Sequence, residues 1–318
     1  METVRRCSYM LPKKRRLCRM LVKPGKMFCG EHEIFDPDNE ERVVCPKDPG
    51  HTVNKSELAF HLTKRCNSRL PTEPWVVKNI NVVEPNRREA DCETETAFEE
   101  RIVRVATIVE LAYGDIASSV SDEVKTTSVV EEYIKSQKTI NATRLKHLRQ
   151  LSSIIGYLNV NGLLKNDENH CLMDIGAGKA QLAYWTSKVA PKCRSLLIER
   201  SGVRFKFENK ACREDPALHF TRLRCPVEDL DLSKVDTLKD VTSLSAVCKH
   251  LCGRATDYGL RCLRNAVNSG INFEGFALVP CCHHKSTFAE YAGRSFLAKY
   301  ELDNALDFHA LCYMAAWA

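Results

Sequence analysis

The spacing of apolar residues predicts two long helices in the middle of the chain. In the stretch FEERIVRVATIVELAYGD, apolar side chains recur every three or four positions, which is typical of one face of an α-helix. A second helical pattern, ATRLKHLRQLSSIIGYLNV, follows Asn141. We expect both helices to pack onto a larger domain that follows, with His147 exposed rather than catalytic. The first helical face consists of Ile102, Val105, Ile108, Val109 and Ala112.

From Cys171 onward the pattern changes to short apolar runs separated by helical segments. The runs are CLMDI, SLLIE, FTRLRC, LSAVCK and FEGFALV, and the helical segments include QLAYWTSKVA and TDYGLRCLRNAV. Strands that alternate with helices are typical of a parallel sheet with helices on both faces. We therefore predict an α/β, Rossmann-like domain with a parallel doubly wound sheet.

The N-terminal segment contains few large apolar residues but carries spaced cysteines and histidines. One set has the spacing C-x10-C-x10-C-x2-H, and its close pair suits two ligands of one tetrahedral zinc ion. Such a segment could hardly fold without a metal. We predict a CCCH zinc-binding module over residues 1–34, and the alternative is a disordered tail with unliganded cysteines. The ligands would be Cys7, Cys18, Cys29 and His32.

A second set of potential ligands lies in CPKDPGHTVNKSELAFHLTKRC. The Pro49-Gly50 pair predicts a turn, and SELAFHL predicts a short helix with Ser56 as its N-cap. We predict a CHHC zinc-binding module over residues 42–67, against a helical hairpin with incidental histidines. Its ligands would be Cys45, His51, His61 and Cys66, the last of which must fold back to reach the metal.

Composition and charge place the basic character of the chain at its N-terminus. Residues 68–96 are polar and contain three prolines, so we expect a linker there, followed by the main domain over residues 97–318. The formal net charge is +6, but residues 1–30 alone carry nine basic residues and one acid, which leaves −2 for the rest. The N-terminal module should therefore contact a polyanion.

The sequence also bears on where the protein works. No apolar run approaches the length of a membrane span, and the N-terminus has no apolar signal region. Sixteen cysteines in such a chain indicate metal binding or burial rather than disulfides. We expect an intracellular protein, nuclear and/or cytoplasmic, in which PKKRR serves as an import signal or as a solvated basic loop.

A glycine-containing loop, DIGAGKAQ, follows the first predicted strand. It provides Asp174, Gly176 and Gly178 but lacks the third glycine of the dinucleotide fingerprint. S-adenosylmethionine has no phosphate and needs only close backbone approach. We predict that it binds here, with Glu199 on the ribose hydroxyls and Asp229 near the adenine. The alternative is a glycine turn in a non-catalytic sheet with a solvated Glu199.

Several of these motifs together resemble one known family. The CCCH module, CPKDPGH…H…C, GAGKAQL, LIERSGVRFKFENK, CKHLCGRATD and CCHH are similar to segments of the eukaryotic tRNA acceptor-stem 2'-O-methyltransferases, the tRNA:m(4)X modification enzymes. The resemblance covers most of the chain. It implies a class I methyltransferase domain, two structural zinc ions, and methyl transfer from S-adenosylmethionine to the ribose of nucleotide 4 in the tRNA acceptor stem.

The chain differs from the family pattern in two places. The family's CHHC finger usually has three residues between its last histidine and cysteine, whereas this chain has four. Family members also continue past the tryptophan-alanine at the end of YMAAWA, so the resemblance implies a further strand or loop beyond Ala318.

The motifs KHLCG and CCHH follow the fourth and fifth strands, where open parallel sheets bind ligands. An A-form helix displays its 2'-hydroxyls in a shallow minor groove, so no base needs to be flipped. A ribose hydroxyl needs a proton acceptor, and we expect Lys249 with a depressed pKa, or His250, to fill that role. The alternative for His250 is a hydrogen bond to the backbone only.

Two further groups are expected to face the substrate. Arg200, Arg204 and Lys206 would contact phosphates unless they belong to a solvated helix face. The run of Cys281, Cys282, His283 and His284 resembles a metal site, but neighbours on an extended chain point in opposite directions. We therefore interpret Cys282, His283 and His284 as a wall of the substrate pocket.

Two other functions fit the sequence. The first is a non-catalytic RNA-binding zinc protein with an inactive methyltransferase fold. The second is a metal-dependent redox or hydrolytic enzyme built on the late cysteines.

Overall fold

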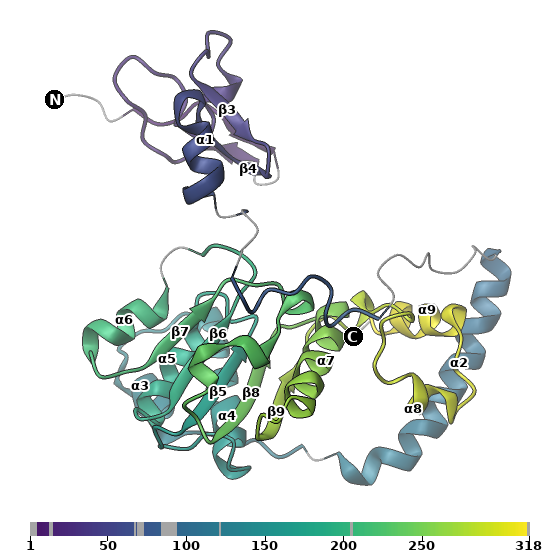
Figure 1. Cartoon of the computed structure of the whole chain (residues 1–318). Coiled ribbons are helices and arrows are strands. Elements are labelled where there is room, and N and C mark those ends of the chain that lie inside the picture. Colours follow the sequence, from purple (N-terminus) through teal and green to yellow (C-terminus); the bar gives the residue numbers. More distant parts are fainter. Residues whose placement is uncertain are drawn as a thin grey trace. The chain divides into compact units, whose positions relative to one another are not determined.

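The computed structural model of the chain (Figure 1) describes residues 5–12, 15–66, 68, 73–83, 94–120, 122–203 and 206–316. Two compact units can be distinguished, residues 1–71 and residues 72–318, and each is described by itself. None of the described helices is both long enough and apolar enough to span a bilayer.

The first unit is built from short elements around its cysteines. Strands β1 (Met10–Leu11) and β2 (Arg16–Leu17) pair antiparallel, as do β3 (Arg42–Cys45) and β4 (Asp48–Asn54). Short helical turns follow: η2 (Glu33–Phe35), η3 (Lys55–Glu57), α1 (Leu58–Phe60) and η4 (His61–Arg65). Among its described apolar residues, only the cysteines and Val53 are fully buried, whereas Met10, Met20 and Met27 are exposed. Cysteine side chains thus replace an ordinary hydrophobic core.

The second unit contains the predicted parallel sheet. Its strands lie in the order β7-β6-β5-β8-β9, and all neighbours are parallel. Each strand coincides with one of the apolar runs, so the Rossmann-like fold class predicted from the sequence is confirmed. The strands are β5 (His170–Ile175), β6 (Arg194–Ile198), β7 (Phe220–Leu223), β8 (Ser243–Lys249) and β9 (Phe273–Val279).

Helices cover both faces of this sheet (Figure 1). One face buries Leu172 and Val247 against α3 (Ser128–Ser136), α4 (Ala142–Val160) and α5 (Gln181–Val189). The other face packs Met173 and its neighbours against α7 (Arg254–Asn268) and the turns η6 (Val227–Asp229), η7 (Leu232–Lys234) and η8 (Asp236–Leu238). Alternation of side chains along a strand explains why Leu172 and Met173 belong to different layers. His147 is exposed on α4, as expected.

The remaining helices form a separate apolar cluster. Helix α2 (Glu95–Ile116) packs against α8 (Arg294–Ala298) and α9 (Ala305–Met314), with Val105, Leu297 and Phe308 buried between them. Arg101 and Arg104 pair with the buried carboxylate of Asp307. The first predicted helix therefore contacts the C-terminal helices, whereas α4 covers the sheet.

Part of the expected linker lies against the second unit. Val76 bridges to Leu230, and the buried Asn81 side chain donates to the carbonyl oxygens of Val227 (2.7 Å) and Leu230 (2.9 Å). Residues 73–83 thus border the loop that follows β7.

A glycine in α4 provides a test of this packing. A Cβ atom at Gly156 would lie 2.6 Å from the backbone nitrogen of Thr126, so Gly156→Ala should destabilise the protein by about 1–3 kcal/mol through overpacking. Gly114 in α2 has no atom within 4 Å of such a Cβ, so Gly114→Ala should stabilise by about 0.5–1 kcal/mol. Urea denaturation measures both, and a higher midpoint for Gly156→Ala would contradict the packing.

Candidate functional site

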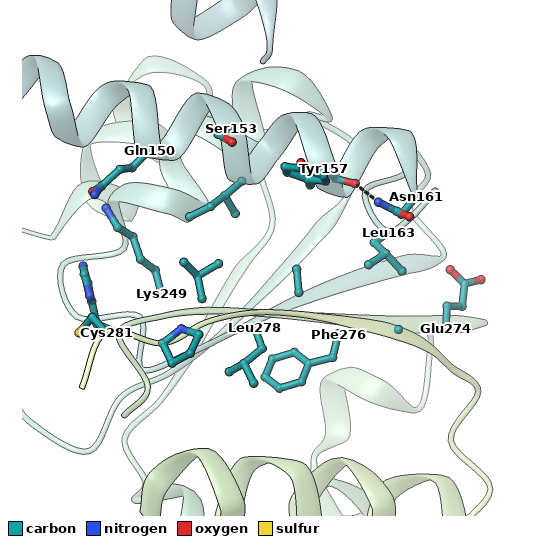
Figure 2. Close-up of a pocket in the computed structure, with 16 residues that line it drawn as sticks. Gln150, Ser153, Tyr157, Asn161, Leu163, Lys249, Glu274, Phe276, Leu278 and Cys281 are labelled. Carbon is teal, nitrogen blue, oxygen red and sulfur yellow. Dashed lines mark hydrogen bonds between the residues drawn. The ribbon is translucent and has the colours of Figure 1, made fainter. Parts of the chain in front are cut away.

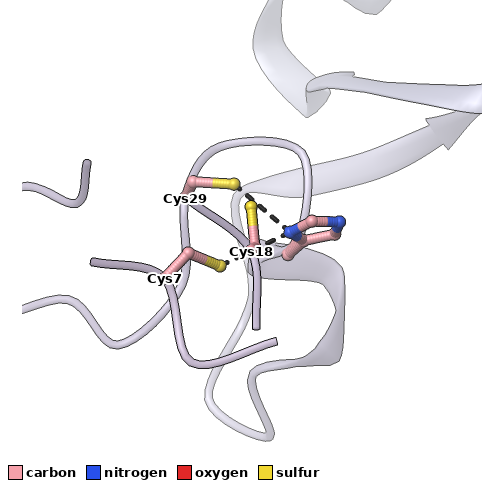
Figure 3. A group of neighbouring side chains, drawn as sticks. Cys7, Cys18 and Cys29 are labelled. Carbon is pink, nitrogen blue, oxygen red and sulfur yellow. Dashed lines mark hydrogen bonds between the residues drawn. The ribbon is translucent and has the colours of Figure 1, made fainter. Parts of the chain in front are cut away.

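The first predicted zinc set is assembled in the structure. Cys7, Cys18, Cys29 and His32 bring their ligand atoms within 4.8 Å of one another (Figure 3). The Sγ atoms of Cys7 and Cys29 each lie 3.4 Å from Nδ1 of His32. Tyr9 stacks on the His32 ring at 4.1 Å between centroids and fixes its orientation. Because tetrahedral zinc holds sulfur and nitrogen ligands about 3.6 Å apart, the set fits one zinc ion.

The second set converges in the same way, Cys66 included. The Sγ atoms of Cys45 and Cys66 are 3.6 Å apart, and Nε2 atoms of His51 and His61 are 3.1 Å apart. The extra residue between His61 and Cys66 is absorbed by a π-helical turn, η4, in which the Cys66 N–H donates to the His61 carbonyl at 2.6 Å. This wider turn places Cys66 among the ligands despite the longer spacing.

The glycine loop after β5 offers space for a ligand. Gly176 and Gly178 have φ angles of +76° and +51°, which favour glycine. Among the described residues, no atom lies within 4 Å of a Cβ built on Gly178, so none of their side chains requires a glycine at this position. Close approach of a ligand to the backbone is a physical reason for a glycine at position 178. The Cδ1 atom of Leu251, in the KHLCG loop, lies 3.7 Å from the position that a Cβ would take on Gly176. The glycine loop and the KHLCG loop therefore lie side by side.

Glu199 stands directly after β6 with its carboxylate fixed. One oxygen accepts a hydrogen bond from Gly178 N at 2.9 Å and the other accepts from Ser201 N at 2.8 Å. Two of about four acceptor positions of a carboxylate are thereby used. The others suit the hydroxyls of a ribose, as the sequence predicts.

Asp174 lies on β5 itself, before the loop, with only 4% of its surface exposed. Burial raises its pKa to about 7, although the charge of Arg222 opposes this shift. The carboxyl group of Asp174 therefore keeps its proton up to about pH 7.

Asp229 is held by the segment before α2. Its Oδ1 accepts a hydrogen bond from Asn79 N at 2.7 Å, and its carbonyl oxygen accepts from Val77 N. Residues 73–83 therefore form part of the wall where we expected the adenine, a contribution that the polar sequence of this segment did not predict.

Lys249 and His250 border one cavity of about 800 Å³ between α4 and β9. Figure 2 shows the Lys249 side chain extending toward Gln150 of α4. Burial lowers the pKa of Lys249, and no carboxylate among the described residues forms an ion pair with it. The pKa of His250 is also lowered, by burial and by the nearby charges of Lys249 and His147. Both groups are thus shifted toward their neutral, proton-accepting forms.

The CCHH run does not behave as expected. We predicted that adjacent cysteines would point apart, but β9 ends at Val279 and the chain turns. The Sγ atoms of Cys281 and Cys282 are 3.5 Å apart, and Cys252 from the KHLCG loop joins them, with its Sγ 3.2 Å from that of Cys281. The assumption of an extended backbone through Cys282 was therefore wrong, whereas the expectation that all four residues of the run do not converge on one ion stays a prediction, because the side chain of His283 is not described.

The pKa values of Cys252 and Cys281 are shifted in opposite directions. Burial raises the pKa of Cys252, but hydrogen bonds from Cys281 and Cys282 outweigh it and leave the pKa below its ordinary value. The same contacts raise the pKa of Cys281 to about 12. Cys252 is therefore more readily ionised than Cys281.

The remaining predicted substrate residues are placed as follows. Arg200 is exposed after β6, and Lys206 is the N-cap of α6 (Phe207–Glu214). His284 is exposed in the turn η9 (His283–Lys285). Arg204 and the side chain of His283 lie outside the part of the chain that the structure describes. Sequence reasoning overlooked Gln150 and Cys252, although Cys252 stands inside the quoted KHLCG motif.

Known proteins match the chain over nearly its whole length. The model of the family "Methyltransferase TRM13" matches residues 149–318. A CCCH zinc finger in TRM13 protein matches residues 5–33, and a U11-48K-like CHHC zinc finger matches residues 42–67.

Curated relatives agree with these models. The tRNA:m(4)X modification enzyme TRM13 of Eremothecium gossypii is 31% identical over an alignment 357 residues long, gaps included. The alignment covers 98% of this chain and 78% of the relative. The TRM13 homolog of Homo sapiens is 29% identical, with 98% and 74% covered. A solved coclaurine N-methyltransferase bound to N-methylheliamine and SAH aligns with a TM-score of 0.32 at 14% identity, covering 65% of this chain and 71% of that one.

The role of Cys66 can be tested by zinc content. Cys66→Ser removes one of four ligands, so the purified variant should contain about one zinc ion less per chain than the parent protein. Cys212→Ser, at a partly exposed cysteine of α6 outside the three clusters, is the control and should leave the metal content unchanged. Plasma mass spectrometry gives the count, and equal zinc in both variants would show that Cys66 is not a ligand.

The raised pKa of Asp174 predicts how stability depends on pH. The native state keeps this proton up to about pH 7, whereas an unfolded aspartate releases it near about pH 3.9. Between these values the native state binds more protons, so the free energy of unfolding should fall as pH rises toward 7 and then level off. In guanidinium denaturation, Asp174→Asn should remove this decline. An identical pH dependence in both proteins would refute it.

Proposed function

Because the chain belongs to the TRM13 methyltransferase family, we propose that it transfers a methyl group from S-adenosylmethionine to the ribose 2'-hydroxyl of nucleotide 4 in the tRNA acceptor stem. The relatives are named as tRNA:m(4)X modification enzymes. The observation that supports the reaction type best is the partly buried Lys249 at the carboxyl end of β8, which forms no ion pair with a carboxylate among the described residues.

The cofactor position is supported by the loop between β5 and α5. S-adenosylmethionine would supply the electrophilic methyl group. Gly178 leaves open space beside the loop, and Glu199 keeps acceptor capacity for ribose hydroxyls. Leu251 borders Gly176, so the residues before it in the KHLCG loop lie next to the same crevice. Asp174 lies beneath, where it would favour a cation when ionised.

Lys249 is the proposed proton acceptor. Burial lowers its pKa, so a larger fraction of the amine is neutral than in water. Its side chain extends toward Gln150, whose buried Oε1 has no hydrogen-bond partner among the described residues (Figure 2). When Lys249 takes the ribose proton, the ammonium can donate to this oxygen. Gln150 would then stabilise the protonated form without being charged.

The RNA would be held chiefly through its backbone. Arg200 is exposed near the cofactor loop and suits a phosphate, as does Lys206 at the start of α6. In the N-terminal unit, Arg5, Arg6 and Arg19 are exposed around the first cysteine set. We infer that both N-terminal sets hold one structural zinc ion each, and that this module binds RNA by charge, with strong salt dependence.

The product identifies the reaction. Unmodified tRNA incubated with the protein and S-adenosylmethionine should yield one 2'-O-methylated nucleoside, at nucleotide 4, in mass spectrometry of nuclease digests. A tRNA with a 2'-deoxyribose at nucleotide 4 should remain unmethylated. A base-methylated product would overturn the ribose assignment. RNA binding without cofactor binding would favour a non-catalytic zinc protein.

Substitution of Lys249 tests the proton acceptor. Lys249→Ala should lower kcat by about 10²–10⁴-fold while the Kd for tRNA changes little, since general base catalysis is lost. Lys239→Ala is the control, because Lys239 is exposed and pairs with Asp236. A tritiated-methyl assay measures turnover, and full activity in Lys249→Ala would reassign the role, with His250→Ala as the next variant.

A further inference from the structure

Three thiols from two loops meet at the carboxyl edge of the sheet. Cys252 follows β8, and Cys281 and Cys282 follow β9. The Sγ atom of Cys281 lies 3.2 Å from that of Cys252 and 3.5 Å from that of Cys282, and all three sulfurs lie within 4.8 Å of one another. Residues 29 or more positions apart in sequence are thus brought to one point by the parallel pairing of β8 with β9.

This cluster differs from the buried cysteines of the second unit. Cys171, Cys193, Cys225, Cys248 and Cys262 are buried and contribute to the core as small apolar side chains. Cys281 is exposed, and Cys252 and Cys282 are partly exposed. Hydrophobic packing accounts for the first group. It does not account for three sulfurs gathered where an ion can reach them from solvent.

The spacing matches that of the N-terminal ligand sets. Tetrahedral zinc with sulfur ligands at about 2.3 Å holds the sulfurs about 3.8 Å apart. The distance in the CHHC set is 3.6 Å, and the distances here are 3.2 and 3.5 Å. Small side-chain rotations close the difference.

Backbone hydrogen bonds to sulfur provide a second parallel. Cys281 N donates to Cys252 Sγ at 3.2 Å, just as Ser68 N donates to Cys66 Sγ at 3.3 Å. Such donors stabilise a thiolate, which is the form that binds a metal. In both the cluster and the CHHC set, a backbone N–H group therefore stabilises the thiolate form of one cysteine.

From this geometry we propose that Cys252, Cys281 and Cys282 bind a third zinc ion at the rim of the crevice. Three protein ligands leave the fourth position of a tetrahedral ion open to water or to another ligand. The role of the ion rests on the proposed methyl transfer, since it lies beside Lys249, whereas zinc binding itself can be measured without any turnover.

The ion would fasten two loops together beside Lys249. A Cβ on Gly253 would lie 2.4 Å from the carbonyl oxygen of Lys285, so the two loops already touch through their backbones. Zinc bound by Cys252 and Cys281 would link the two loops at a second point. This link would lie at the cavity that Lys249 and Cys281 both line. Its role is thus to position the loop that directly follows Lys249.

Metal content is the direct test. The full chain, purified under reducing conditions, loaded with zinc and desalted, should contain about three zinc ions by plasma mass spectrometry. Cys281→Ser should contain about two, and Cys212→Ser, with its cysteine on α6, should retain three. Two zinc ions in the parent protein would overturn the proposal.

Thiol labelling gives a second test on the parent protein, so its result does not depend on whether a substituted variant folds. In the zinc-loaded native protein, iodoacetamide should label Cys212 but not Cys281, which is the more exposed of the two. Removal of zinc should make Cys281 reactive. Labelling of Cys281 at the same rate with and without zinc, or a disulfide between Cys252 and Cys281 in the native protein, would refute zinc binding.

Discussion

Hydrogen bonding of β5 to β6 on one side and to β8 on the other determines where the candidate residues lie. Because the strands are parallel, their carboxyl ends emerge at one edge, and the chain reverses its winding direction between β5 and β8. The glycine loop, Glu199 and the KHLCG loop follow these three strands in turn. Their proximity is thus a property of strand order, and the local sequence of each loop needs only to supply the right side chain.

The sequence predicted the sheet well for a physical reason. Strands buried on both faces are continuous apolar runs, and five such runs separated by helical segments leave few other folds. The two candidate zinc sets could also be predicted from the sequence, because a tetrahedral ion favours ligands that lie close together along the chain. Only the π-helical turn at His61–Arg65, which accommodates the extra residue, was not anticipated.

What the sequence could not predict depends on contacts between distant segments. Cys252 joins Cys281 only because β8 and β9 are neighbours and β9 ends just before the pair. Asn79 meets Asp229 through a segment that is polar and looks like a linker. The raised pKa of Asp174 follows from burial at the centre of the sheet, which no local pattern reveals. The approach of Lys249 to Gln150 likewise requires α4 to lie across β9.

The cysteine-rich interior of the N-terminal unit determines which conditions unfold this unit. Apart from Thr52 and Val53, the described side chains buried there are Cys7, Cys18, Cys29, Cys45 and Cys66, whereas the sheet unit buries leucine, isoleucine and valine. If the first unit holds zinc as proposed, a chelator should unfold it, whereas the apolar core of the sheet unit does not depend on a metal. Depletion of zinc should therefore unfold the first unit under conditions in which the sheet unit stays folded.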